Sequence, residues 1–323
     1  MLSLTRARFS PSPIRKSRSI SMLAALLALA LPRWALAGAW VLAPGEHYST
    51  VGGSYFSSDY YYDQDGTRLS LKDGGLHEEK SLFSYNEFGW KKSRSFVLGM
   101  PFTSVTRNFS PGGVDSTHTE TGFGDLLVGV KFRLTGGASA MSFEADWVPP
   151  LGYNRNISPR LGDGAASLIG TLAYGAPIAK AGFLELSGGY RYYTEAQAPT
   201  DEMLASATLA FWLGRSVLIS GRYDGTFGAS SQDTLYQALR IKTPQGRAWT
   251  NSDAWPNTTT DQITLQTFSP TLLYRLDDHL DVMAGTSHTF SAKNALHVDR
   301  IYVAIALRQS KLGPLQGFMG GRR

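Results

Sequence analysis

Nine charged residues stand at alternate positions of segments that otherwise read as strands. They are Asp125, Lys131, Arg133, Glu144, Asp146, Glu185, Arg191, Arg222 and Asp224. Successive side chains of a strand point to opposite faces, so these charges would share one face of a sheet while apolar residues occupy the other. Charges of both signs on one face can pair and so fill and stiffen the interior of a barrel. They can also line a hydrated path and select the solutes that pass. In either interpretation, these nine residues are the candidates for lining a lumen.

The histidines form neither a catalytic nor a metal-binding pattern in the sequence. Ser287 and His288 are adjacent, and adjacent strand residues point to opposite faces, so His288 cannot serve as the base of Ser287 and should face outward near the outer rim. The others stand at strand ends or in connections: His47, His77, His118, His279 and His297. Asp63-Gln64-Asp65-Gly66 resembles the start of a calcium loop, but the remaining ligands and the closing Glu are missing. We expect no enzymatic activity, no cofactor and no metal site.

The elements that must position these charges are short strands with two different faces. Their expected ranges are 46–57, 80–90, 94–106, 122–134, 138–148, 165–176, 183–194, 202–213, 217–227, 262–275, 280–290 and 299–308. A tilted strand of about ten residues crosses a bilayer, and in lipid a sheet satisfies every backbone group only if it closes. An even strand number places both ends of the barrel on one side. The sequence therefore predicts an all-β fold, a transmembrane up-and-down antiparallel β-barrel of about 12 strands.

The connections alternate between short and long, as in outer-membrane barrels with short periplasmic turns and long outer loops. Tight turns are expected at residues 91–94, 135–137, 178–182, 214–216 and 276–279, and longer polar connections at 58–79, 107–121, 149–164, 195–201, 228–261 and 291–298. The connection 228–261 contains Trp249 and Trp255 among polar residues. One hypothesis is that it folds into or over the mouth of the barrel and restricts passage. An exposed loop is the alternative.

Aromatic residues favour a membrane barrel over a soluble sandwich, which would alternate in the same way. One group falls at the expected periplasmic strand ends: Trp90, Phe96, Phe132, Phe183, Phe211, Trp212 and Tyr274. Another falls at the outer ends: Tyr60, Tyr61, Trp147, Tyr190, Tyr192, Phe227 and Phe290. Two aromatic girdles are typical of the two interfaces of a bilayer.

The first 37 residues have the pattern of a secretory signal peptide. The apolar run 22–31 follows a basic front, is too short to span a bilayer as a helix and precedes Ala35-Leu36-Ala37. We expect cleavage before Gly38, a barrel over residues 38–310 and a short tail over 311–323. Residues 1–37 carry six basic residues and no acidic one, so their removal changes the formal net charge from +5 to −1. That balance gives nucleic acid no electrostatic basis as a partner.

Several short motifs resemble one known family. Gly122-Phe123-Gly124-Asp125-Leu126 opens a strand that ends in Val130-Lys131-Phe132-Arg133-Leu134. This segment resembles the GxGD…K-aromatic-x-L strand of the outer-membrane proteins of the MetA-pathway of phenol degradation family. Pro44-Gly45, Glu87-Phe88-Gly89 and Met100-Pro101-Phe102 are similar to other parts of that family. The resemblance implies an outer-membrane barrel that passes organic compounds.

We therefore expect a channel in the outer membrane of a Gram-negative bacterium for passive uptake or release of small organic solutes, aromatic or amphipathic ones among them. Its expected partners are outer-membrane lipid, those solutes and the barrel-assembly machinery. The oligomeric state is open. The alternative is a non-transporting barrel with a structural or surface-binding role.

Overall fold

The computed structural model describes residues 38–110, 113–153, 159, 161–178, 181–194, 200–229 and 263–309. The chain divides into two units, Met1–Trp34 and Ala35–Arg323, and every described residue belongs to the second. The expected signal peptide, the tail 311–323 and nearly all of the connection 228–261 lie outside the described residues. The hypotheses about these three segments therefore stay predictions.

The described residues form strands and one short 3₁₀ helix. The wall strands are β1 (His47–Ser58), β4 (Leu76–Lys91), β5 (Arg94–Phe109), β6 (Ser116–Phe123), β7 (Leu127–Thr135), β8 (Ala140–Val148), β9 (Ser167–Ile178), β10 (Gly182–Tyr193), β11 (Glu202–Leu213), β12 (Val217–Gly228), β13 (Thr264–Arg275), β14 (Leu280–Lys293) and β16 (Asp299–Gln309). A small separate sheet contains β2 (Tyr60–Tyr62), β3 (Arg68–Ser70) and β15 (Ala295–Leu296), and the helix is η1 (Lys72–Gly74). No helix among the described residues is long and apolar enough to cross a membrane.

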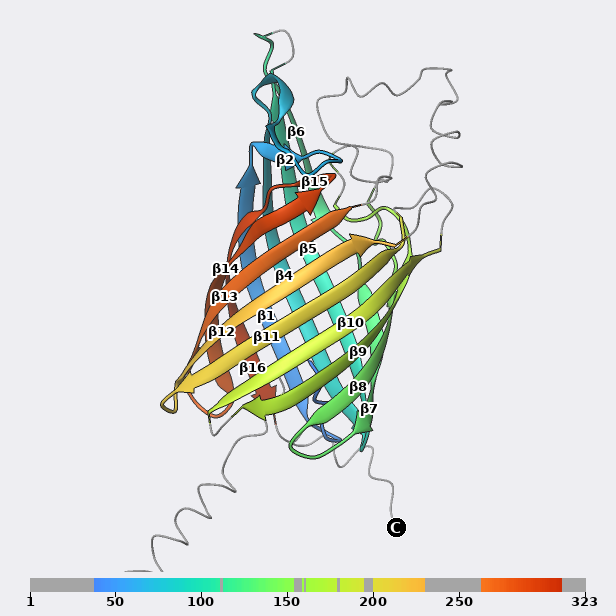
Figure 1. The fold of residues 1–323 in the computed structure, drawn as a ribbon, viewed down its shortest axis with the longest axis vertical. Helices are drawn as coiled ribbons and strands as arrows, with labels where there is room; N and C mark the ends of the chain where they lie inside the picture. Colours follow the sequence, from blue (N-terminus) through green and yellow to red (C-terminus); the bar gives the residue numbers. More distant parts are fainter. Residues whose placement is uncertain are drawn as a thin grey trace, which may run out of the picture. The chain divides into compact units, whose positions relative to one another are not determined.

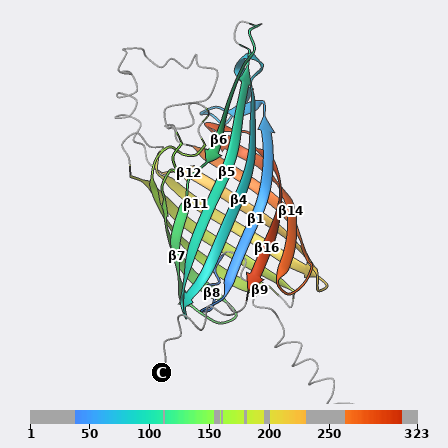
Figure 2. The ribbon, with the colours of Figure 1, turned by 180° about the vertical axis from the view of Figure 1, so that it is seen from behind.

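The wall strands close into a ring of antiparallel neighbours (Figures 1 and 2). β1 pairs with β4 on one side and with β16 on the other, where His47 lies opposite Gln309. β6 and β7 pair with successive parts of β5, so together they occupy one place in the ring despite the break between Phe123 and Leu127. The ring therefore has twelve places, and the predicted 12-stranded barrel is confirmed.

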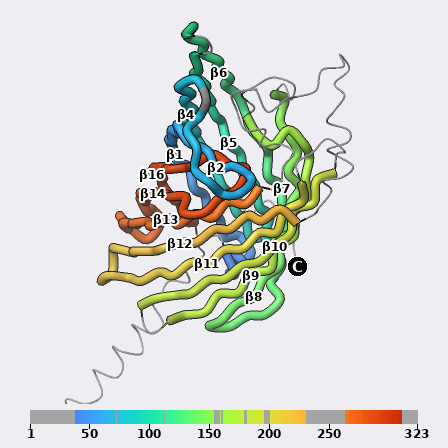
Figure 3. The backbone as a smooth tube through the Cα atoms, turned by 45° about the horizontal axis from the view of Figure 1, so that its top comes forward, coloured from blue at the N-terminus to red at the C-terminus, as the bar shows by residue number. Residues whose placement is uncertain are grey.

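The strands extend further at the long-loop end than the sequence predicted. β4 begins at Leu76, β5 runs to Phe109 and β6 begins at Ser116, so the expected connections 58–79 and 107–121 are partly strand. In Figure 3 these strands rise beyond the others. Cross-strand hydroxyl pairs hold them, with Thr106 and Thr119 at 3.0 Å and Thr121 donating to Ser104 at 2.9 Å. The sequence did not predict this extension, because polar residues on its outer face remove the apolar–polar alternation of a lipid-facing strand.

The apolar faces point away from the interior of the barrel. On β16, Ile301 and Val303 are each 57% exposed, whereas Ala304 and Ala306 on the other face are buried. A soluble β-protein would bury the aliphatic face. The observed inversion is that of a barrel whose outer surface contacts lipid.

Most of the predicted aromatic girdles lie on this outer surface. Trp90, Phe96, Phe211 and Tyr274 are exposed at the short-turn end, and Trp147, Tyr190, Tyr192 and Phe290 at the other. The predicted girdle position is wrong for Phe183 and Trp212, because both pack on the interior cluster of Ala210, Leu218 and Leu273. Each lies near its strand end as expected but on the opposite face.

A lipid-facing cation on β16 tests this orientation. Val303 lies midway along the strand, so we expect Val303→Arg to lower the free energy of unfolding by about 2–4 kcal/mol. The measurement is urea unfolding of the barrel refolded in liposomes, followed by heat-modifiable migration on a gel. Val303→Ala is the size control. Equal stability of the two variants would mean that Val303 faces water.

Candidate lumen site

A buried lysine pairs with carboxylates of the interior toward the short-turn end of the wall. Lys131 on β7 lies 3.3 Å from Glu87 on β4 and 3.7 Å from Glu144 on β8. The side chains of Lys131 and Glu87 are 2% and 0% exposed. Lys131 and Glu144 are direct cross-strand partners, so the β7–β8 register alone brings them together. Burial makes each of these charges dependent on its partner, because an unpaired charge away from water is strongly unfavourable.

Asp146 adds a further carboxyl group on the same face of β8 as Glu144. Its cross-strand partner is Gly129, and a Cβ atom at Gly129 would lie 1.8 Å from the Asp146 Oδ1 atom. The absence of a side chain at Gly129 thus makes room for the carboxylate inside the wall. This side of the interior is acidic, with three carboxyl groups near Lys131.

Residues 38–43 lie inside the barrel and are held by the same charged side chains. The Ala39 amide donates to Glu185 Oε2 at 3.2 Å, and the Leu42 amide donates to Glu87 Oε1 at 3.4 Å. The Arg133 guanidinium donates to the Val41 carbonyl oxygen. Three of the charged groups of the interior therefore bind the backbone of one non-strand segment, which satisfies polar groups that would otherwise be buried without partners.

This crossing segment, residues 38–43, reaches between opposite walls. Ala39 packs on Ala140 of β8 and Ala173 of β9, whereas Leu42 packs on Tyr48 of β1 and Ala306 of β16. β9 and β16 are six places apart in the ring of twelve, so they face each other across the lumen. The segment therefore spans the interior.

Two glycines of the wall accommodate the crossing segment. A Cβ atom at Gly175 would lie 2.4 Å from the Trp40 ring, which packs edge-on against Phe183 at 5.8 Å. A Cβ atom at Gly89 would lie 1.9 Å from the Ala43 carbonyl oxygen. At both positions any other residue would displace the segment from the wall.

A second group of charges lies near the long-loop end. Arg191 on β10 is 3.2 Å from both Asp163 and Glu202, and the Tyr193 hydroxyl donates to Asp163 at 3.1 Å. Arg191 and Glu202 are cross-strand partners. The connection before β9 supplies Asp163, so this group fastens that connection to the wall.

Asp125 belongs to the same group. It lies in the break between β6 and β7, where its carboxylate accepts hydrogen bonds from the Tyr153 hydroxyl and the Asp163 amide, both at 2.7 Å. Burial raises the pKa of the Tyr153 phenol, and the hydrogen bond to Asp125 raises it further. Tyr153 therefore stays protonated and keeps donating to Asp125.

Arg222 and Asp224 on β12 form a more solvated pair. They are 2.7 Å apart and their side chains are 45% and 40% exposed. Both share the strand face of Leu218, which is buried in the interior. Exposed ion pairs contribute little to stability, so these groups are the ones best able to exchange a partner for a solute.

The nine predicted residues therefore separate by place and by partner. Lys131, Glu144 and Asp146 come together, Arg133 and Glu185 bind the crossing segment, Asp125 and Arg191 join the outer group, and Arg222 pairs with Asp224. Sequence reasoning missed Glu87, Asp163, Glu202 and Asp281, the last of which pairs with Arg275 at 3.5 Å and with Arg308. The sequence did contain a signal for Glu87, because alternation places it on the same strand face as Phe83 and Tyr85.

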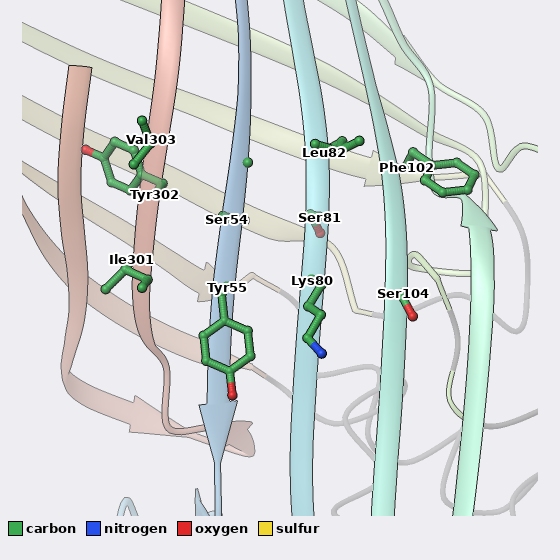
Figure 4. A pocket seen from close by; sticks show the side chains of 11 residues that line it. Ser54, Tyr55, Lys80, Ser81, Leu82, Phe102, Ser104, Ile301, Tyr302 and Val303 are labelled. Atoms are coloured by element: carbon green, nitrogen blue, oxygen red, sulfur yellow. The ribbon is translucent and has the colours of Figure 1, made fainter. Parts of the chain in front are cut away.

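A groove of about 520 Å³ lies elsewhere, over β16, β1, β4 and β5 (Figure 4). Leu82, Phe102 and Val303 line it, and all three belong to the exposed outer surface. Gly53, which has no side chain to fill the space, also lines the groove. None of the nine predicted residues lines this groove, which therefore belongs to the lipid-facing wall and not to the lumen.

Comparison with known proteins gives one family and several barrels. The family model described as "Putative MetA-pathway of phenol degradation" matches residues 58–305, whereas no curated protein matches. The COG4313 outer membrane channel from Pseudomonas putida F1 is 14% identical, with a TM-score of 0.61 over 84% of this chain and 98% of that one. The translocator domain of the autotransporter NalP from Neisseria meningitidis superposes more loosely, at 10% identity and a TM-score of 0.44 over 90% and 96% of the two chains. The NanC porin does likewise, at 8% identity and 0.46 over 81% and 100%.

The buried ion pair predicts a non-additive response to mutation. Lys131→Met leaves Glu87 charged and buried without its cation, so we expect a loss of about 3–5 kcal/mol in the free energy of unfolding. The double variant Glu87→Gln, Lys131→Met should recover much of that loss. Urea unfolding in liposomes measures both.

Arg222→Met is the control for this prediction, because its pair with Asp224 is exposed and should contribute less than about 1 kcal/mol. If the double variant is no more stable than Lys131→Met alone, the two buried groups do not depend on each other.

Proposed function

Because the chain belongs to the MetA-pathway of phenol degradation family and folds as an outer-membrane barrel, we propose that it is a passive channel for small organic solutes. It would serve uptake or release across the outer membrane of a Gram-negative bacterium. The observation that carries the proposal is the crossing segment. Among the residues that the structure describes, the one segment that crosses the lumen is short and non-strand, and carboxylates and apolar contacts hold its ends.

The size of the barrel is compatible with passage of small solutes only. About eight strands can be filled by side chains alone, whereas sixteen leave an open channel. Twelve places leave room for one segment of chain beside the wall residues. A solute would therefore pass beside the crossing segment or after that segment shifts.

The lining favours amphipathic solutes. Trp40, Phe183 and Trp212 give the interior aromatic surface, and Arg222 gives it a solvated cation. A ring bearing a carboxylate or phenolate matches both features, since aromatic rings pack on its face and a guanidinium binds its charge. Aromatic acids and phenols are the solute class that this combination suits best.

The proposed surroundings follow from the outer surface. Outer-membrane lipid would contact the exposed aliphatic faces, such as that of β16. Insertion of the closed ring would require the barrel-assembly machinery. Nothing in this proposal requires catalysis.

A non-transporting structural or surface-binding barrel is the second candidate, favoured by the close packing around the crossing segment. Ala39 and Val41 are 0% and 4% exposed, so the lumen is well filled where they lie. The two functions differ in whether solutes pass. A channel passes solutes when the crossing segment is shifted or removed, whereas a structural barrel has no need to pass solutes in either state.

Liposome flux separates the two. The chain starting at Gly38, refolded in liposomes, should pass small aromatic acids faster than neutral sugars of similar size, and deletion of residues 38–42 should raise the flux of both. Heat-modifiable migration on a gel verifies folding. If neither form conducts above protein-free liposomes, the structural barrel is the better function.

Arg222→Ala tests the selecting charge. Loss of one solvated cation removes about 1 kcal/mol of attraction for an anion at contact distance, so the flux ratio of aromatic acid to neutral sugar should fall about five-fold. Arg215→Ala, an exposed change in the short turn before β12, is the matched control. An unchanged flux ratio in Arg222→Ala would remove this residue from the selecting path.

A further inference from the structure

Three potential metal ligands meet at the long-loop end of β14 and β16, apart from the lumen charges. His288 lies on β14, Asp299 is the first residue of β16, and His297 lies between β15 and β16. His288 and Asp299 are cross-strand partners. One ligand atom from each of the three residues lies within 4.8 Å of the other two. Strand pairing thus assembles a group that is spread over twelve residues of sequence.

The carboxylate of Asp299 stands between the two imidazoles. Its Oδ1 atom contacts His288 Nδ1, and its Oδ2 atom lies 3.2 Å from His297 Nε2. The two imidazole rings meet edge-on, with centroids 5.5 Å apart. His288 and Asp299 share the outward strand face of the lipid-facing residues Phe290 and Ile301. The group therefore lies on the outer surface of the barrel, next to the outer aromatic girdle, where the side chain of His288 is exposed.

His297 is buried and fixed in place. It is 5% exposed, and its Nδ1 atom lies 3.2 Å from the Tyr62 hydroxyl of β2. Its backbone amide donates to the Tyr60 carbonyl oxygen at 3.1 Å. Thr289 bonds both the amide and the carbonyl of Val298 through its hydroxyl, at 3.1 Å each. These bonds orient one imidazole toward Asp299 before any ligand arrives.

We propose that His288, His297 and Asp299 form a binding site for a divalent transition metal, with zinc as the best-matched ion. Two imidazole nitrogens and one carboxylate oxygen are a common zinc ligand set, with the fourth position open to water. Nitrogen donors disfavour calcium and magnesium, which take oxygen ligands.

The geometry needs only a small contraction to hold the ion. Ligand atoms at the usual zinc distance stand about 3.3 Å apart in a tetrahedron, compared with separations of up to 4.8 Å here. Rotation of the exposed His288 side chain can supply the difference. A metal at His297 Nε2 puts the ring proton on Nδ1, where the Tyr62 hydroxyl oxygen accepts it. A hydrogen-bonded partner of this kind commonly fixes the orientation of a ligating histidine.

Metal binding would fasten the small outer sheet to the barrel. β2 pairs with β15 and, through Tyr62, contacts His297, whereas His288 and Asp299 belong to the wall. A bound ion would therefore connect the β15-β2-β3 sheet to β14 and β16. The site has a structural role in this proposal, with an open coordination position on the outer surface of the barrel.

The sequence-based expectation of no metal site rested on spacing along the chain. Spacing could not reveal this group, because His288 and Asp299 become neighbours only when β14 pairs with β16. The proposal departs from that expectation and does not depend on channel activity.

Zinc binding to the full chain refolded in detergent tests the site. After chelator treatment and dialysis, calorimetric titration with zinc chloride should show one saturable site per barrel. His288→Asn, which changes an exposed side chain, should weaken that site by more than about 100-fold, since even the loss of a hydrogen-bonded partner of a ligand weakens metal binding 10–100-fold. Tyr62→Phe should weaken it by about 10-fold or more.

His118→Asn is the matched control, since His118 is an exposed histidine on β6, outside this group. It should bind zinc as the unmodified chain does. Heat-modifiable migration shows that each variant is folded. The proposal is overturned if the folded unmodified chain has no saturable site, or if His288→Asn and His118→Asn bind equally.

A spectroscopic readout identifies the ligands directly. Copper(II) bound in the same site should give an electron paramagnetic resonance spectrum with hyperfine structure from two imidazole nitrogens, reduced to one in His288→Asn. Two-nitrogen coordination that persists in His288→Asn would place the metal elsewhere and contradict the proposal.

Discussion

Closure of the backbone hydrogen-bond ring is the constraint on which the rest of this structure depends. In lipid an unpaired amide or carbonyl has no water to bind, so the sheet must end where it began. The β1–β16 pairing performs that closure, with ten consecutive residue pairs from His47↔Gln309 to Phe56↔Arg300. Once the ring is closed, each strand has one face toward lipid and one toward the interior. The inverted polarity of β16 follows directly from this.

The closed interior imposes its own requirement on charged side chains. Lys131 and Glu87 are removed from water and therefore need each other, whereas Arg222 and Asp224 remain solvated and need each other less. The backbone polar groups of the crossing segment also need partners inside the lumen. Glu185 and Glu87 accept hydrogen bonds from two of its amides, and Arg133 donates to one of its carbonyl oxygens. The predicted lumen residues thus differ in how strongly each depends on its partner.

The wall was predictable from the sequence, and much of the interior was not. Alternation in lipid-facing strands such as β11 gave the observed bounds, Glu202–Leu213, because one face must be apolar and the other polar. The alternation rule failed for β6, because both faces of this strand contact water and its sequence does not alternate between apolar and polar residues. The girdle assignment, which used only position along the strand, included Phe183 and Trp212 wrongly, since an aromatic residue near a strand end suits either an interface or an interior cluster.

Contacts between distant segments were beyond such reasoning. The partners of Glu87 depend on ring order, and the meeting of His288 with His297 depends on how β15 turns onto β2. The position of residues 38–43 inside the lumen depends on hollows at Gly89 and Gly175 that alternation cannot reveal. These features require knowing which strands are neighbours, and local sequence patterns specify only which residues share a face.

The covalent connection of the crossing segment to β1 has a consequence for binding. Residues 38–43 enter the first strand through only a few residues, so the segment behaves as a ligand tethered to its own receptor. A tether of that length holds its ligand at an effective concentration on the order of millimolar. Any free solute that uses the same interior surface must compete with this internal ligand. Its apparent affinity is then lower than its intrinsic affinity, and occupancy of the lumen becomes appreciable only when the solute is abundant outside.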